Sequence, residues 1–190
     1  MGGRGLAGAV MTMFPASFIT DRLVLRPIAE ADAAAAFAEY AADPLVTRYL
    51  TWVPHDSEQS CAAFFAEQAA RHAAGTLGAY AITLRNNGRL IGAFDLRSDA
   101  AGHRVDFGCV LGRIHWRQGY MSEALSHVVG WVLGQPTVYR IWAVTDVENV
   151  ASARTMEKAG LMREGVLRRW FVHPNLGPEP RDCFRYARVR

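Results

Sequence analysis

Cysteine is scarce in this sequence of 190 residues, and the three that occur, Cys61, Cys109 and Cys183, are widely separated. The sequence contains no CxxC pair and no HExxH segment. Disulfide frameworks and zinc sites depend on such spacings, so neither is predicted and no metal ligands are expected. Free thiols persist in a reducing compartment, which makes the cytoplasm the expected location.

Long hydrophobic runs are also missing. None approaches the ~18 residues that a membrane-spanning helix needs, so no membrane partner is expected. Charge of one sign is not concentrated either, because the formal net charge is +3 and the arginines are spread along the chain. A nucleic-acid-binding face usually carries a basic cluster, so the sequence favours an anionic small molecule over DNA or RNA as a partner.

The length of the chain suits one domain with a proper core, whereas two domains would be cramped. No internal repeat, low-complexity tail or linker divides it. The opening stretch, MGGRGLAGAVMTMFPA, has a short apolar run after Arg4 that resembles an export signal, but glycine and proline interrupt it. We expect residues 1–16 to form a flexible leader and residues 17–190 to form the domain.

The first part of the domain predicts one strand followed by two helices. Residues 22–26 alternate between apolar and polar side chains, as a strand does. The alanine-rich segment 29–42 predicts a single helix, ended by Asp43-Pro44. A longer helix, capped by Asp56 or Ser57, is expected to run to about residue 72.

Three strands are expected next, over residues 79–84, 90–96 and 103–111. The first two are joined through Asn86-Asn87-Gly88, in which Asn-Gly supplies the positive φ angles of a tight hairpin turn. Short connections join neighbouring antiparallel strands, so the segment predicts a three-stranded meander.

The end of the meander is the most informative stretch. After the last strand, apolar side chains recur at helical spacing and predict a helix over about 118–133. A helix that starts there presents unpaired N–H groups and the positive end of its dipole beyond the end of the strand. Gly119 allows a ligand to approach the backbone closely, and Arg117 adds a positive charge. This junction therefore predicts a phosphate or diphosphate site.

The remaining segments complete one α+β domain. A strand is expected over 139–146, and a short helix over 149–159 that ends at Gly160. Two more strands, near 164–172 and 183–189, flank a loop that contains three prolines.

This order of elements, together with several motifs, resembles the GCN5-related N-acetyltransferases, and especially the branch that acetylates the N-termini of ribosomal proteins. The resemblance covers about residues 20–190. The matching segments are Thr20-Asp21-Arg22-Leu23-Val24-Leu25-Arg26-Pro27, Trp116-Arg117-Gln118-Gly119-Tyr120-Met121-Ser122-Glu123-Ala124, Asn149-Val150-Ala151-Ser152, Glu157-Lys158-Ala159-Gly160-Leu161 and Glu164-Gly165.

The resemblance implies acetyl transfer from acetyl-CoA to an amine. It also implies a single GNAT-like domain with a mixed, mostly antiparallel sheet, a splayed strand pair and flanking helices. Pantetheine would pair with the exposed edge of the strand that ends near Cys109, and the N–H of Val110 or Leu111 would stabilise the developing oxyanion. The implied cofactor-binding residues are Val110, Leu111, Gly112, Arg113, Arg117, Gln118, Gly119, Tyr120, Met121, Ser122, Asn149 and Arg154.

The expected catalytic residues are Ser152, Asn149 and Asp106. Met156 stands where many family members carry a tyrosine that protonates the leaving thiolate. By resemblance, Ser152 becomes the acid, with Asn149 orienting groups nearby, while Asp106 is the candidate base.

Each of these residues also has a plainer interpretation. Ser152 and Asn149 could simply satisfy the N–H groups of a first helical turn, and Asp106 could be a solvent-facing strand carboxylate. Glu123 could face the cleft, but a first-turn carboxylate also interacts favourably with the helix dipole. Cys109 could form an acyl-enzyme, although strand alternation can equally place it in the core.

The leading hypothesis is thus an acetyl-CoA-dependent N-acetyltransferase that works by direct attack of the amine. The acceptor is a protein N-terminus or a small molecule such as an aminoglycoside, a polyamine or an amino acid; a homodimer is possible. The alternative is a non-catalytic acyl-CoA-binding module on the same fold. A nucleotide-binding oxidoreductase is disfavoured because a meander is the wrong topology for its sheet.

Overall fold

Eight strands form one sheet, in the order β1-β2-β3-β4-β5-β6-β8-β7, in the computed structural model of the chain, which describes residues 14–190. Only β5 and β6 pair in parallel among these strands, so the sheet is mixed and mostly antiparallel, as predicted. The strands are β1 Phe18–Ile19, β2 Leu23–Pro27, β3 Gly78–Leu84, β4 Leu90–Ser98, β5 Arg104–Leu111, β6 Arg140–Asp146, β7 Met162–Phe171 and β8 Arg181–Val189.

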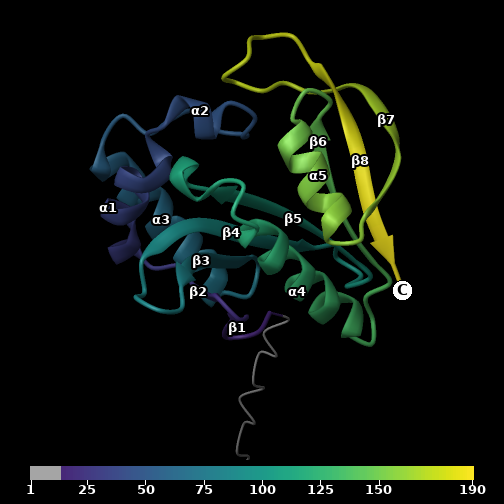
Figure 1. Ribbon diagram of the computed structural model, residues 1–190, viewed down its shortest axis with the longest axis horizontal. Coiled ribbons are helices and arrows are strands. Elements are labelled where there is room, and N and C mark those ends of the chain that lie inside the picture. The colour runs from purple at the N-terminus through teal and green to yellow at the C-terminus, as the bar shows by residue number, and fades with distance from the viewer. Residues whose placement is uncertain (1–13) are drawn as a thin grey trace, which may run out of the picture.

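The pairing between β5 and β6 is short. Arg104, Val105 and Asp106 pair with Arg140, Ile141 and Trp142, and no pair follows along these two described strands. Residues 107–111 of β5 and 143–146 of β6 therefore diverge, which confirms the predicted splayed pair (Figure 1). The sheet consists of two halves, β1–β5 and β6–β8, joined at the narrow end of a splay.

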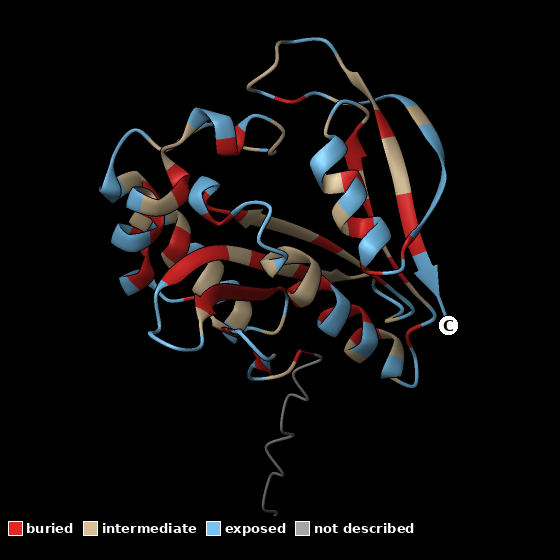
Figure 2. Cartoon of the chain, viewed as in Figure 1, coloured by how far each residue is buried: buried red, intermediate tan, exposed pale blue. Residues whose placement is uncertain are grey.

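The helices cover the two faces of the sheet (Figure 1). Their bounds are α1 Ala33–Ala36, α2 Pro44–Thr47, α3 Glu58–Ala73, α4 Tyr120–Gly134 and α5 Val150–Lys158. One core lies beneath α4 and α5 and includes Leu125, Val128 and Ile141, each with 0% exposure. A second core lies beneath α1 and α3 and includes Cys61 and Phe65. Figure 2 shows buried residues both on the strands and on the helices that pack against them.

The prediction of a single helix over residues 29–42 is wrong. The chain instead forms a 3₁₀ turn, Glu30–Asp32, then α1, then a π-helical turn, Phe37–Ala41. Asp32 fixes the start, because its carboxylate accepts hydrogen bonds from the Ala29 N–H and from the Arg26 guanidinium. Alanine side chains impose little packing preference of their own, so tertiary contacts determine the local winding.

Asp43-Pro44 both ends that segment and starts a helix that the sequence did not predict. Pro44 is the first residue of α2, a position where a missing N–H costs nothing. The Asp43 side chain caps α2 by accepting a hydrogen bond from the Leu45 N–H at 2.9 Å. The next helix, α3, is capped by Ser57, one of the two predicted caps.

The hairpin between β3 and β4 exists, but its predicted backbone conformation is only partly right. Within the described chain, positive φ occurs here at Gly88 alone, at 71°, and not at Asn87. Asn87 uses its side chain instead, accepting a hydrogen bond from the Arg89 N–H at 3.0 Å. The turn is therefore longer than the two-residue type that Asn-Gly suggests.

The packed part of the chain begins before the predicted start at residue 17. Phe14 is buried in the core next to Gly78, and the carbonyl of Pro15 accepts a hydrogen bond from the Tyr80 hydroxyl at 2.8 Å. Residues 1–13 of the predicted leader lie outside the described residues. Among residues 14–190, no helix is long and apolar enough to cross a membrane.

Candidate active site

The loop between β5 and α4 exposes backbone N–H groups to one side. Arg117 and Gly119 both have positive φ angles, 61° and 82°. The first hydrogen bond that closes a turn of α4 runs from the Glu123 N–H to the Gly119 carbonyl at 3.0 Å. The N–H groups of residues 120–122 have no hydrogen-bond partner within the described chain. A cluster of free amides at a helix N-terminus suits an anion, as predicted for this junction.

Arg22, the residue just before β2, supports this loop from a distant part of the chain, a contact that sequence analysis did not predict. Its guanidinium donates to the Gln118 carbonyl at 3.1 Å and to the Glu123 carboxylate at 2.6 Å. It also lies over the Tyr120 ring, 4.4 Å from the ring centroid. About a hundred residues separate these partners, so only the folded sheet shows that they meet.

The same contacts decide between the two interpretations of Glu123. Its carboxylate accepts hydrogen bonds from the Thr20 hydroxyl at 2.6 Å and from the Arg22 backbone at 2.9 Å, so it ties the start of α4 to β2 rather than facing the cleft. Burial raises the pKa of this carboxyl, but the hydrogen bonds from Thr20 and Arg22 outweigh burial and lower it overall.

Backbone groups of β5 alternate between its two neighbours. The Gly112 N–H donates to the Ile91 carbonyl at 2.8 Å and the Arg104 carbonyl accepts from the Asp99 N–H at 2.9 Å, so even-numbered residues are directed to β4. Odd-numbered residues are directed into the splay. Of the two predicted oxyanion donors, Leu111 faces the splay, whereas the carbonyl of Val110 lies against Gly92 of β4.

Fewer backbone groups are unpaired along the free edge of β5 than its length suggests. The carbonyl oxygen of Leu111 accepts a hydrogen bond from the Trp116 indole N–H at 2.7 Å. This leaves the N–H of Leu111 and both backbone groups of Cys109 facing the splay. An extended amide chain can pair with such an edge by strand addition.

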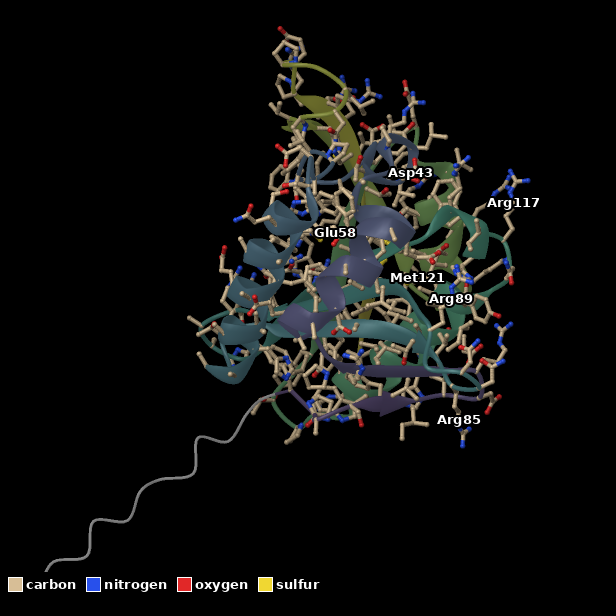
Figure 3. All side chains as sticks on the ribbon, turned by 90° about the vertical axis from the view of Figure 1, so that its left-hand side faces the viewer. Asp43, Glu58, Arg85, Arg89, Arg117 and Met121 are labelled. Atoms are coloured by element: carbon tan, nitrogen blue, oxygen red, sulfur yellow. The ribbon has the colours of Figure 1, made fainter. Side chains whose placement is uncertain are left out.

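The predicted residues just beyond β5 are held by the helical layer that contains α1 and α2. Gly112 leaves room for Glu39, whose Oε1 would lie 2.5 Å from a Cβ at this position. Arg113 pairs with Asp43 at 3.0 Å. Figure 3 shows Arg117 projecting from the edge of the molecule, with Met121 nearer its body.

Asp106, the predicted base, sits at the last paired position of β5, opposite Trp142. Its carboxylate accepts a hydrogen bond from the Arg97 Nε at 2.6 Å. Arg97 also pairs with Asp95, so one guanidinium joins two carboxylates on the face of the sheet away from α4. A hollow of about 190 Å³ adjoins Asp106 and is lined by Ser98, Asp99, Arg104, Asp106, Trp142 and Arg185.

The start of α5 places Asn149 and Ser152 together. Asn149 is the N-cap, and its side chain accepts a hydrogen bond from the Ser152 N–H at 3.2 Å. The Ser152 hydroxyl is half-buried and makes no hydrogen bond to any described residue. Met156 packs in the core with 2% exposure, and Arg154 is exposed. Both roles proposed for Ser152 remain compatible with this position.

A loop closes over the wide end of the splay. The Asn175 side-chain amide donates to the carbonyls of Thr47 and Trp52, at 2.7 and 2.8 Å, which joins the β7–β8 loop to α2 and the segment after it. At the base of this loop, Arg181 forms a two-point ion pair with Asp146, whose exposure is 0%. Burial raises the pKa of Asp146, but Arg181, the Glu148 N–H and His173 together lower it by more.

The structure disfavours an acyl-cysteine. Burial raises the pKa of the Cys109 thiol to about 12, which keeps it protonated, and the thiolate is the reactive form. Among residues 14–190 no group of three or more His, Cys, Asp or Glu side chains could hold a metal ion.

Comparison with known proteins identifies the family. The model of the acetyltransferase (GNAT) domain matches residues 22–162. The chain belongs to the GNAT acetyltransferases. An uncharacterised N-acetyltransferase of Bacillus subtilis, YoaA, is 35% identical to this acetyltransferase over 179 residues, covering 94% of this chain and 99% of YoaA.

Solved structures share the fold of this acetyltransferase. The microcin C7 self-immunity acetyltransferase MccE, solved with acetyl-CoA and AMP, matches with a TM-score of 0.82 and 16% identity, covering 94% of this chain and 99% of the other. RimL, a ribosomal L7/L12 α-N-protein acetyltransferase solved with coenzyme A, matches with a TM-score of 0.79 and 19% identity, covering 90% and 96%.

Proposed function

We propose that this enzyme transfers an acetyl group from acetyl-CoA to a primary amine by direct attack of the amine on the thioester. The observation that carries the proposal is the adjacency of two unsatisfied backbone surfaces: the free N–H groups of residues 120–122 and the unpaired edge of β5. A diphosphate fits the first, and an amide-bearing arm fits the second. Acetyl-CoA has both parts, in that order.

The backbone of β5 would also assist the chemistry. The N–H groups of Cys109 and Leu111 face the splay and can donate to the thioester carbonyl as its oxygen gains negative charge. The amine nitrogen bonds to the carbonyl carbon, the C–S bond breaks, and the sulfur leaves as a thiolate. We assign the proton donor to that thiolate to Ser152, whose hydroxyl has no competing partner among the described residues. The nitrogen loses a proton as the amide forms, and this proton restores the Ser152 hydroxyl.

The acceptor is a protein N-terminus or a small-molecule amine. The name of RimL specifies a protein α-amine, and the structure of MccE holds a nucleotide beside acetyl-CoA. The open sheet face beside Trp142, with its hollow, is where either acceptor would approach. We place the enzyme in the cytoplasm, because a reducing compartment keeps its free thiols reduced. Size-exclusion chromatography at two protein concentrations tests the possible homodimer.

Two measurements test the proposal. Calorimetry should detect acetyl-CoA binding, and a thiol-release assay with a panel of peptides, polyamines, aminoglycosides and amino acids should detect turnover. Gly119→Glu should abolish binding, because its backbone is left-handed and a carboxylate there repels a diphosphate. Gly130→Glu is the matched control, since Gly130 is exposed on α4 with nothing within 4 Å of an added Cβ.

Unchanged acetyl-CoA affinity in Gly119→Glu would contradict the assigned phosphate site. Binding without thiol release for every amine in the panel would favour the alternative, a non-catalytic acyl-CoA-binding module.

A further inference from the structure

Asp95 occupies a position that only a neighbouring glycine makes possible. The register of β4 and β5 sets Asp95 opposite Gly108. A Cβ added to Gly108 would lie 2.8 Å from Oδ2 of Asp95 and 3.2 Å from Oδ1, which is too close. The Asp95 carboxylate therefore fills the space where a side chain of β5 would stand. The Gly108 N–H holds it there by donating to Oδ1 at 3.1 Å.

This placement carries the carboxylate across β5 toward the splay. Gly108 lies two residues beyond Asp106, the last residue of β5 that pairs with β6. It also precedes Cys109, whose backbone groups face the splay and would receive the thioester. The carboxylate thus lies over the residue next to Cys109, where the proposed binding mode would place the thioester carbonyl, on the face of the sheet that neither α4 nor α5 covers. Its side chain is 36% exposed, so an acceptor can reach it.

Charged and titratable groups surround Asp95 on three elements. Arg97 lies beside it on β4, Asp106 and the Cys109 thiol lie on β5, and Arg71 faces it from α3. Burial raises the pKa of Asp95 above its usual 3.8, and the two arginines and the Gly108 N–H only partly offset that increase. A carboxylate of this kind can take up a proton nearer to neutral pH than an ordinary aspartate can.

We propose that Asp95, held in the space left by Gly108, is the general base that takes a proton from the ammonium group of the acceptor. This inference rests on the proposed function. The ammonium gives one proton to the Asp95 carboxylate and becomes a neutral amine. Its nitrogen bonds to the acetyl carbon, the C–S bond breaks, and the Ser152 hydroxyl protonates the leaving sulfur. The second proton of the nitrogen then restores that hydroxyl. Asp95 then releases its proton to solvent.

Asp106 is less well placed for this task. Both carboxylates accept a hydrogen bond from the Arg97 guanidinium, so this ion pair does not distinguish them. Their positions do, because Asp106 stands at the closed end of the splay, where β5 is still paired to Trp142. Arg97 therefore links the two carboxylates, and Asp95 is the one that reaches toward the open edge.

The experiment compares Asp95→Asn with the wild-type enzyme as a function of pH, using the best amine of the panel. Asparagine keeps the size of the side chain and an oxygen for the Gly108 N–H. We expect kcat/KM to fall about 10²-fold at pH 7, with acetyl-CoA affinity changed less than twofold. The deficit should shrink as pH rises, because the acceptor then arrives as a neutral amine. A merely structural role would give a deficit that does not depend on pH.

Two further variants complete the test. Glu58→Gln, at an exposed position in the first turn of α3, should keep the wild-type pH profile. Gly108→Ala should reproduce the Asp95→Asn profile with both carboxylates intact, because it displaces the Asp95 side chain. Two results would overturn the assignment while leaving acetyl transfer established. One is a wild-type pH profile in Asp95→Asn. The other is a pH-dependent deficit in Asp106→Asn that Asp95→Asn does not show. Acetyl-CoA binding without turnover in the wild type would overturn the proposed function and this inference together.

Discussion

The indole N–H of Trp116 donates to the carbonyl oxygen of Leu111 at 2.7 Å, and so fastens the loop between β5 and α4 to the end of β5. The contact satisfies one of the few backbone acceptors that face the splay, and it joins the two surfaces that we propose bind acetyl-CoA.

Trp116→Phe tests this arrangement. Phenylalanine keeps an aromatic ring but has no N–H, so the Leu111 carbonyl loses its partner and the loop loses its anchor. We expect acetyl-CoA to bind about 10-fold more weakly, which corresponds to ~1.4 kcal/mol, measured by calorimetry. Trp170→Phe, at an exposed position of β7, is the control and should bind normally. Equal affinities in the two variants would remove Trp116 from the site.

Ser152→Ala tests the proton donor. The hydroxyl is assigned to the leaving thiolate, so its removal should lower kcat about 10²-fold while acetyl-CoA affinity stays the same. Thr155→Val on the same helix is the control, because that hydroxyl donates only to the carbonyl of Ala151. Full activity in Ser152→Ala would exclude Ser152 as the proton donor and leave it only a structural role in the first turn of α5.

Asp146→Asn tests the ion pair with Arg181. Arg181 keeps its second partner, Glu148 at 2.9 Å, so the change removes charge-assisted hydrogen bonds without orphaning the guanidinium. We expect the free energy of unfolding to fall by about 1.5–3 kcal/mol. Glu179→Gln is the control: its pair with Arg169 is exposed on both sides and should contribute about 0–1 kcal/mol. Urea unfolding at pH 7 measures both.

The pH dependence of stability follows from the same pair. The folded-state pKa of Asp146 lies below its usual 3.8, so its contribution is complete above that value and is lost as pH falls through the folded pKa. The melting temperature of the wild type should therefore drop below about pH 4, and that of Asp146→Asn should drop less. Parallel curves for the two proteins would show that Asp146 does not carry this acid sensitivity.

Local patterns were enough to predict the joint between β5 and α4. The change from strand to helix periodicity around residues 116–121, with Gly119 at the joint, lies within one short segment. The N-cap at Asn149 was predictable for the same reason. The resemblance added the splay between β5 and β6, which periodicity alone does not contain. Val110, one of the two expected oxyanion donors, shows what local patterns cannot predict, because the direction of its N–H depends on the register with β4.

Contacts that depend on distant strands could not be predicted. Arg22 and Gln118 meet only after β2 packs beside α4, and Asp95 meets Gly108 only in the register of the meander. Each of these residues has an ordinary sequence context: an arginine in an alternating strand, or a glycine in the middle of one. The prediction of one helix over residues 29–42 was wrong for a different reason. Its alanine side chains have little packing preference, so tertiary contacts determine which type of helical turn forms.

Asn175 has a mechanical consequence for the whole enzyme. The two halves of the sheet are hydrogen-bonded to each other as strands only at the narrow end of the splay, and the Asn175 amide ties them again at the wide end. Hydrogen bonds therefore hold the wedge between them at both tips. Under the proposed function, an acceptor that enters from the wide end has to pass this contact.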